Sequence, residues 1–277
     1  MIKKIICPVD FSTSSLNALE YAAKLAQVFN SELMLINVQR ISMPAAAVSM
    51  GEGIGAHVHE DALLASERLK EIAVETNKMF NISTHYEVEI TAMAMEKTFA
   101  SAGEKNVMIV MGTNGIDDVD QYIFGTNTYN VIKKTNCPVF IVPENVTFSR
   151  MKKIIFAWDY THKNKFSFSL LNEFMNEFNP QFVFLHVSKR PSEIGKDVFN
   201  ALRDEIIEVL GNTTNVEFEQ IYSDDVPESI NRYMRKSKAD MLSITFYNRG
   251  LIPDLFHGTV AKDLSAVADY PILVLHA

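Results

Sequence analysis

An internal repeat constrains the fold of this chain more than any other feature. The N-terminal stretch KKIICPVDF returns as KKIIFAWDY, so that Asp10 aligns with Asp159 at a spacing of 149 residues that the whole stretch shares. A repeat of this length indicates duplicated domains, because the repeats of solenoid proteins are only about 20–50 residues long. We therefore expect one domain over residues 1–145 and a second over residues 151–277, separated by the polar segment PENVTFSRM.

Each half alternates short apolar runs with amphipathic stretches. Runs such as ELMLINV, VMIVM, CPVFIVP, FVFLHV and PILVLH are typical of buried strands. The stretch SSLNALEYAAKLAQVF carries apolar residues at helical spacing. Further helices are expected near residues 59–79, 93–102, 125 onward, 194–210, 226–237 and 258–267. Strands that alternate with helices predict an α/β fold with right-handed crossovers, here two tandem doubly wound domains that each hold a five-stranded parallel sheet.

The last strand of each half, CPVFIVP and PILVLH, is expected at the edge of its sheet. An edge strand presents unpaired backbone groups that another strand can cover. We therefore expect the two halves to pack about a pseudo-twofold axis through these strands, as an intramolecular pseudo-dimer. A further homodimer remains open.

Composition excludes several classes of function. The chain has 26 basic and 34 acidic side chains and a net charge of -8, whereas nucleic acids and anionic membranes bind basic surfaces. Its two cysteines, Cys7 and Cys137, lie in apolar surroundings and are expected to be buried free thiols in a cytoplasmic protein. No apolar run approaches the roughly 18 residues of a membrane span. With no zinc signature and no nucleophile elbow, we expect no metal site, no catalytic residue and no enzymatic activity.

The segment GTNGIDDVDQYIFGT follows the apolar run VMIVM and contains the candidate binding site. Gly112 and Gly115 can adopt backbone angles that other residues avoid. Gly125 stands where a helix is expected to begin, so that an anion can approach the free backbone N–H groups, and Thr126 can cap this helix or bind a phosphate through its hydroxyl. The helix N-terminus carries about half a positive charge, which favours phosphate without a lysine. The segment matches neither the Walker A motif nor the dinucleotide fingerprint GxGxxG.

These residues carry a family resemblance. The spacing G-x2-G-x9-G-[ST] resembles the ATP-binding signature of the universal stress protein family, and the opening stretch PVDFSTSSLNALEYA is similar to the first unit of that family. Both halves share the resemblance, so the chain resembles a tandem, two-domain member. This implies an adenine nucleotide alpha hydrolase-like fold, ATP as ligand with or without Mg²⁺, and a stress response exerted through nucleotide-dependent contacts with a protein partner. Other members of the family lack the glycines and bind no ATP.

The resemblance also implies the residues of the site. The adenosine part would be lined by Pro8, Val9, Asp10 and Val38. The ribose and phosphates would be approached by Met111, Gly112 and Gly115. The phosphates would be held at the helix start by Gly125, Thr126 and Asn127. Two alternatives stay open, an interaction module that binds no nucleotide and a slow ATPase or nucleotidyl-transfer enzyme.

One departure from the family concerns the interior of the glycine loop. Many members have basic residues there, whereas this chain has Asp117, Asp118 and Asp120. Carboxylates near a triphosphate repel it unless they face solvent, as charge runs usually do, or hold a divalent metal.

The second half departs further from the motif. In its segment SITFYNRGLIPDLFHGT, alignment places Phe246 opposite Gly112 and leaves a loop that is one residue shorter, so that only Gly258 and Thr259 match the motif. Trp158 stands opposite Val9 and could fill an adenine pocket. We therefore expect one functional nucleotide site, in the first half, and a degenerate site in the second.

Overall fold

The computed structural model describes residues 1–40, 54–91, 106–113, 125–157, 168–188, 200–201, 203–204, 206–208, 215–246 and 270–276. The first half contains β1 (Lys4–Pro8), α1 (Thr13–Phe29), β2 (Glu32–Arg40), α2 (Ile54–Phe80), β3 (Thr84–Thr91), β4 (Val107–Thr113), α4 (Gly125–Lys134) and β5 (Val139–Pro143). The second half contains β6 (Lys153–Ala157), α5 (Phe168–Phe178), β7 (Gln181–Ser188), β8 (Val216–Tyr222), α7 (Val226–Ser237), β9 (Met241–Phe246) and β10 (Ile272–His276). The helices expected at 93–102 and 258–267 lie outside the described residues.

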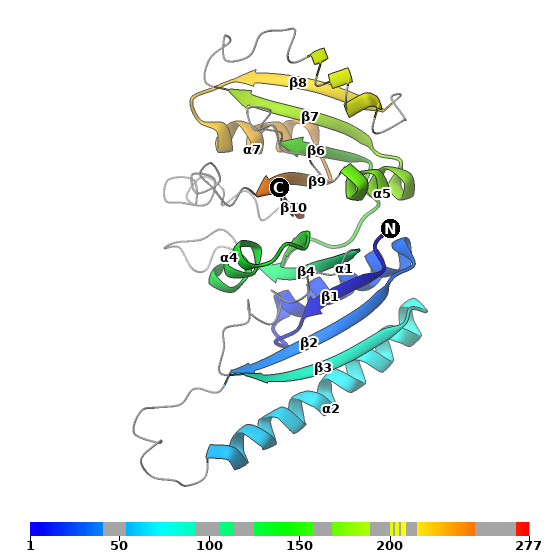
Figure 1. Ribbon diagram of the computed structural model, residues 1–277, viewed down its shortest axis with the longest axis vertical. Coiled ribbons are helices and arrows are strands. Elements are labelled where there is room, and N and C mark those ends of the chain that lie inside the picture. Colours follow the sequence, from blue (N-terminus) through cyan, green and yellow to red (C-terminus); the bar gives the residue numbers. More distant parts are fainter. Residues whose placement is uncertain are drawn as a thin grey trace.

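All of these strands belong to one continuous sheet. Its order is β3-β2-β1-β4-β5-β10-β9-β6-β7-β8, so each half contributes five neighbouring strands in the same order of connection (Figure 1). Within each half the neighbouring strands are parallel, as the alternation of strands and helices predicts. The α/β fold with two five-stranded parallel units is therefore confirmed.

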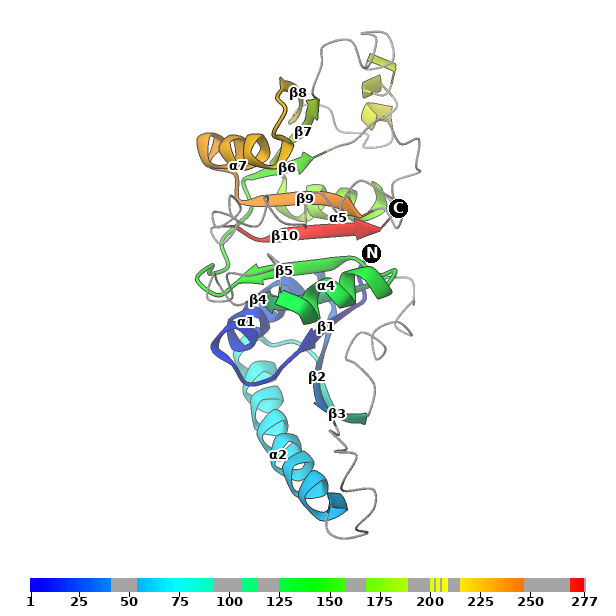
Figure 2. The same ribbon diagram turned by 90° about the vertical axis from the view of Figure 1, so that its left-hand side faces the viewer.

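The two halves meet where β5 and β10 pair in antiparallel fashion (Figure 2). The expected contact between the last strands is thus confirmed, and its form is an edge-to-edge continuation of the sheet. Phe140 stands opposite Leu273 at the centre of this pairing. The edges that remain at the two ends, β3 and β8, carry glutamates at 87, 89, 217 and 219, and charges of this kind discourage pairing with another chain.

Helices cover both faces of the sheet. On one face α1, α2 and α5 pack against a core that includes Leu25, Leu69 and Phe174. On the other face α4 and α7 pack against a second core that includes Ile132 and Met234. Because both faces are covered, the central strands are apolar along their whole length, as expected for parallel strands.

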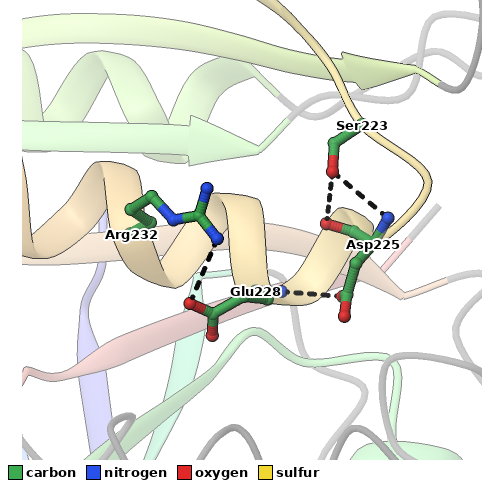
Figure 3. A network of polar contacts seen from close by, with 4 residues as sticks. All are labelled: Ser223, Asp225, Glu228 and Arg232. Atoms are coloured by element: carbon green, nitrogen blue, oxygen red, sulfur yellow. Dashed lines mark hydrogen bonds and ion pairs between the residues drawn. The ribbon is translucent and has the colours of Figure 1, made fainter.

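Side chains fix where two helices begin. The Ser12 side chain accepts a hydrogen bond from the backbone N–H of Ser15 at the start of α1. At the start of α7 the Asp225 carboxylate accepts from the N–H of Glu228 at 3.1 Å, and the Ser223 hydroxyl bonds the Asp225 backbone (Figure 3). Each cap satisfies an N–H group that has no partner within its helix.

Within the described residues, no helix combines the length and apolar character that crossing a membrane requires.

Candidate functional site at the β1–β4 switch point

The candidate site lies beyond the carboxyl ends of β1 and β4. The chain runs from β1 to β2 and β3 on one side and then returns to β4 on the other side of β1. The two strands pair with Ile6 opposite Ile109, so Asp10 follows β1 at the same edge of the sheet at which β4 ends, one residue after Gly112. In open parallel sheets, ligands bind outside the carboxyl ends of the strands at such a reversal of strand order.

The end of β1 presents one ionised carboxylate to this edge. Pro8 and Val9 are buried, whereas Asp10 is exposed. The Oδ1 atom of Asp10 accepts hydrogen bonds from the N–H of Ser12 at 3.0 Å and from its hydroxyl at 2.5 Å. Burial acts to raise the pKa of Asp10, but hydrogen bonds from Ser12 and Ser15 outweigh it and hold the pKa below its ordinary value. The carboxylate is therefore charged and held in a fixed orientation.

The residue after Asp10 has an unusual backbone. Phe11 has a φ of 66°, in the left-handed region that bulky residues rarely occupy. The Arg68 guanidinium, on α2, lies over its ring at 4.4 Å from the centroid. This cation–π contact fixes the turn between β1 and α1 to a second helix.

Gly112 has a steric role that the sequence did not suggest. A Cβ atom at this position would lie 2.6 Å from the carbonyl carbon of Ser14 and closer still to its oxygen. Gly112 is also paired with Val142 as an ordinary strand residue. A glycine is therefore required at position 112 because α1 approaches β4 closely, and not because the backbone has an unusual angle there.

The end of β2 offers backbone groups to the same edge. Val38 is half-buried and lies beyond the last residue of β2 that pairs with β1, which is Ile36 opposite Pro8. Beside it, Asn37 is buried, and its Nδ2 atom donates to the Val9 carbonyl at 2.6 Å. Gln39 donates in turn to the Oδ1 atom of Asn37 at 2.5 Å.

The start of α4 carries three more of the residues expected at the site. This helix begins at Gly125, as expected, so Thr126 lies within the first turn and not at the capping position before it. Asn127 is exposed, and Met111 is buried at the end of β4. Gly115 and the aspartates at 117, 118 and 120 lie outside the described residues.

The register of the second half corrects its alignment with the first. Ile5 pairs with Met108 and the equivalent Ile154 pairs with Met241, so the two copies of the fourth strand are 133 residues apart. Thr245, and not Phe246, therefore stands opposite Gly112, and the same spacing separates Gly258 from Gly125. The expectation of a loop one residue shorter is wrong, because it rested on matching the loops without the paired strands that fix their ends.

Two side chains that can carry chemistry are buried. Cys7 is buried, as expected, and burial together with the negative charge of Asp10 raises the pKa of its thiol, which leaves it unreactive. His186 is buried on β7. No group of three or more potential metal ligands occurs in the part of the chain that the structure describes.

Sequence reasoning missed two residues that shape the site. Asn37 could have been found, because a single amide within the apolar run ELMLINV implies a buried polar group that needs a partner. Phe11 could not, because nothing in the local sequence indicates a positive φ for a phenylalanine.

This geometry defines a class of protein: parallel α/β units in which the strand order reverses beside β1, with Asp10 and the end of β4 at the same edge of the sheet. The model of the universal stress protein family matches residues 1–143. A universal stress protein of Methanocaldococcus jannaschii is 30% identical over 144 residues, which are 51% of this chain and 82% of that protein. Universal stress protein YxiE of Bacillus subtilis is 28% identical over 152 residues, or 51% of this chain and 99% of that protein. The chain belongs to the universal stress protein family.

A solved structure extends the similarity to the whole chain. A universal stress protein from Archaeoglobus fulgidus aligns with a TM-score of 0.72, and the match covers 100% of this chain and 99% of that one. At 17% sequence identity this similarity shows a shared fold.

Proposed function

We propose that the first half binds an adenine nucleotide, ATP, in the crevice between β1 and β4. The observation that carries the proposal is the position of Asp10 and the end of β4 at the carboxyl edge of two paired strands, where the strand order reverses. The glycine spacing, which resembles the family's ATP-binding signature, supplies the second argument.

The start of α4 suits the phosphates. The first N–H groups of a helix have no partner within it, and the helix dipole adds positive potential there. α4 has no acidic residue in its first turn to oppose an anion, and Lys133 and Lys134 stand at its far end. Gly125, Thr126 and Asn127 would hold the phosphates, with Gly115 and, at the end of β4, Met111 and Gly112 bordering them.

The ends of β1 and β2 suit the nucleoside. The Asp10 carboxylate can accept hydrogen bonds from ribose hydroxyls, and its orientation is already fixed by Ser12. Pro8 and Val9 supply an apolar floor, and Val38 supplies backbone groups for adenine.

We propose that binding, and not turnover, is the function, with a change in contacts to a protein partner as its output. Asp10, the carboxylate that follows β1 at this edge, has a lowered pKa that makes it a poor general base. In the second half, Thr245 replaces Gly112, so the site there is proposed to be degenerate. The domains at 1–145 and 151–277 would then have different roles.

Isothermal titration of the full chain with ATP and Mg²⁺ tests the proposal. A side chain at the first helical turn blocks phosphate, so Gly125→Val should weaken ATP binding about tenfold or more, a loss of about 1.4 kcal/mol. Gly258→Val, at the equivalent position of the second half, is the matched control and should change affinity less than twofold. Absence of binding at millimolar ATP, or equal losses in the two variants, would overturn the proposal. Repeating the titration without Mg²⁺ shows whether a metal contributes.

A further inference from the structure

The backbone hydrogen bonds between β1 and β2 end one bond earlier than the direction of the backbone groups allows. In a strand between two parallel neighbours, successive residues direct their backbone groups to alternate sides. Glu32 and Ile36 bond to the β1 side, through Lys3 and Val9, whereas Leu33 bonds to the β3 side, through Ser83. Val38 is two residues beyond Ile36, so its N–H and C=O groups also point towards β1.

The side chain of Asn37 takes the acceptor that Val38 would otherwise use. The last backbone bond between the strands runs from the Val9 N–H to the Ile36 carbonyl at 2.9 Å. The next would run from the Val38 N–H to the Val9 carbonyl. That carbonyl accepts instead from the Nδ2 atom of Asn37 at 2.6 Å.

Asn37 is itself fixed in place. The residue is 3% exposed, so its amide must find partners inside the protein. Gln39 donates to its Oδ1 atom at 2.5 Å, which leaves the Nδ2 atom directed at Val9. A side-chain amide that competes with a backbone ladder in this way ends the ladder locally.

We propose that Asn37 is a positioning residue for purine recognition: by capping the Val9 carbonyl, it leaves the backbone N–H and C=O of Val38 free to read the edge of the base. The inference rests on the proposed nucleotide site. An adjacent donor and acceptor match adenine, which has a ring-nitrogen acceptor beside its amino donor. Guanine presents an oxygen acceptor where adenine has the amino group, so the same pair rejects it.

The second half carries a different side chain at this position. At the 149-residue spacing of β2 and β7, His186 stands where the first half has Asn37. A neutral imidazole has one N–H donor and one acceptor nitrogen in place of the amide's NH₂ and carbonyl groups.

The test replaces Asn37 by leucine, which has a similar size and no donor, in the full chain. Amide hydrogen exchange followed by NMR should show the Val38 N–H exchanging faster than that of Ile36 in the wild type. In Asn37→Leu the Val38 N–H can bond to the Val9 carbonyl, so its exchange should slow about tenfold. If Asn37→Leu fails to fold, Gln39→Leu serves as the second variant. It removes the hydrogen bond to the Oδ1 atom of Asn37, so that the amide is no longer held against the Val9 carbonyl.

Binding provides the second readout. Titrations compare ATP, GTP and inorganic tripolyphosphate, which has no base. Asn37→Leu should weaken ATP about tenfold and reduce the preference for ATP over GTP, while tripolyphosphate changes less than twofold. Asn231→Leu, at a fully buried asparagine of α7, is the matched control and should leave the ATP/GTP ratio unchanged.

The outcomes separate this inference from the proposed function. A Val38 N–H as protected as that of Ile36 in the wild type, or parallel losses of ATP and tripolyphosphate in Asn37→Leu, would overturn the role of Asn37. Wild-type protein that binds ATP no better than GTP would also overturn it. Wild-type protein that binds neither ATP nor tripolyphosphate would instead overturn the nucleotide site, and this inference with it.

Discussion

Phe29 and Phe178 occupy equivalent positions in the two halves, and their rings meet. They are the last residues of α1 and α5, each is followed by an asparagine with positive φ, and their ring centroids are 6.0 Å apart in a T-shaped arrangement. Phe140 and Leu273, the partners at the centre of the β5–β10 pairing, are a second equivalent pair. The pseudo-twofold axis therefore passes through two contacts, each between a residue and its equivalent in the other half.

The Phe29–Phe178 contact should couple the stability of the two halves. Both rings are buried, and Phe29 also contacts Phe174 at 5.0 Å. Truncation of either ring to alanine should cost about 3–5 kcal/mol in the free energy of unfolding. A double-mutant cycle, measured by urea denaturation, should give a coupling of about 0.5–1.5 kcal/mol. Tyr222→Ala, at a half-exposed ring, is the control, and strictly additive losses for the pair would contradict the prediction.

Gly112→Ala should destabilise the first half even in the absence of any ligand. The added methyl group would overlap the Ser14 carbonyl, a backbone group that cannot rotate away. Overpacking of this kind typically costs about 1–3 kcal/mol. Thermal unfolding without nucleotide measures the effect. An unchanged melting temperature would show that α1 can shift, and that the glycine serves the ligand alone.

Asp225→Ala should destabilise the second half by about 1 kcal/mol, because the N–H of Glu228 loses its cap (Figure 3). Asp225→Asn keeps an acceptor oxygen and should recover most of the loss. By contrast, Arg232→Ala removes only the solvent-exposed ion pair with Glu228 at 3.6 Å, which should matter little. Chemical denaturation measures the loss of stability in the three variants. A larger loss for Arg232→Ala than for Asp225→Ala would contradict the prediction.

His276 should make stability depend on pH. Its Nε2 atom donates to the Ile132 carbonyl across the two halves at 2.7 Å, and burial holds its pKa below the ordinary 6.5. Because the unfolded chain takes up the proton more readily, the stabilisation from neutral His276 is complete above about pH 6.5 and is lost as the pH falls through the folded-state pKa.

Urea unfolding between pH 8 and pH 5 checks this expectation. His276→Gln keeps a donor for Ile132 but cannot be protonated, so it should lose less stability on acidification than the wild type does. Equal losses in the two proteins would show that other groups account for the pH dependence.

Much of the fold could be predicted because it depends on local pattern. The apolar runs and the repeat of KKIICPVDF predicted parallel strands in two copies, and Gly125 predicted where α4 begins. The candidate site was less accessible. Its residues come from three strands and a helix, and the register that brings Thr245 opposite Gly112 depends on pairing across the sheet.

The sequence by itself determined the duplication and the order of the strands, because both are written in periodicity and spacing along one chain. Tertiary structure alone decided the antiparallel, edge-to-edge form of the β5–β10 pairing, the steric need for Gly112 and the contact of Asn37 with Val9. The physical reason is distance along the chain: these contacts join groups 28 or more residues apart, and only packing brings such groups together.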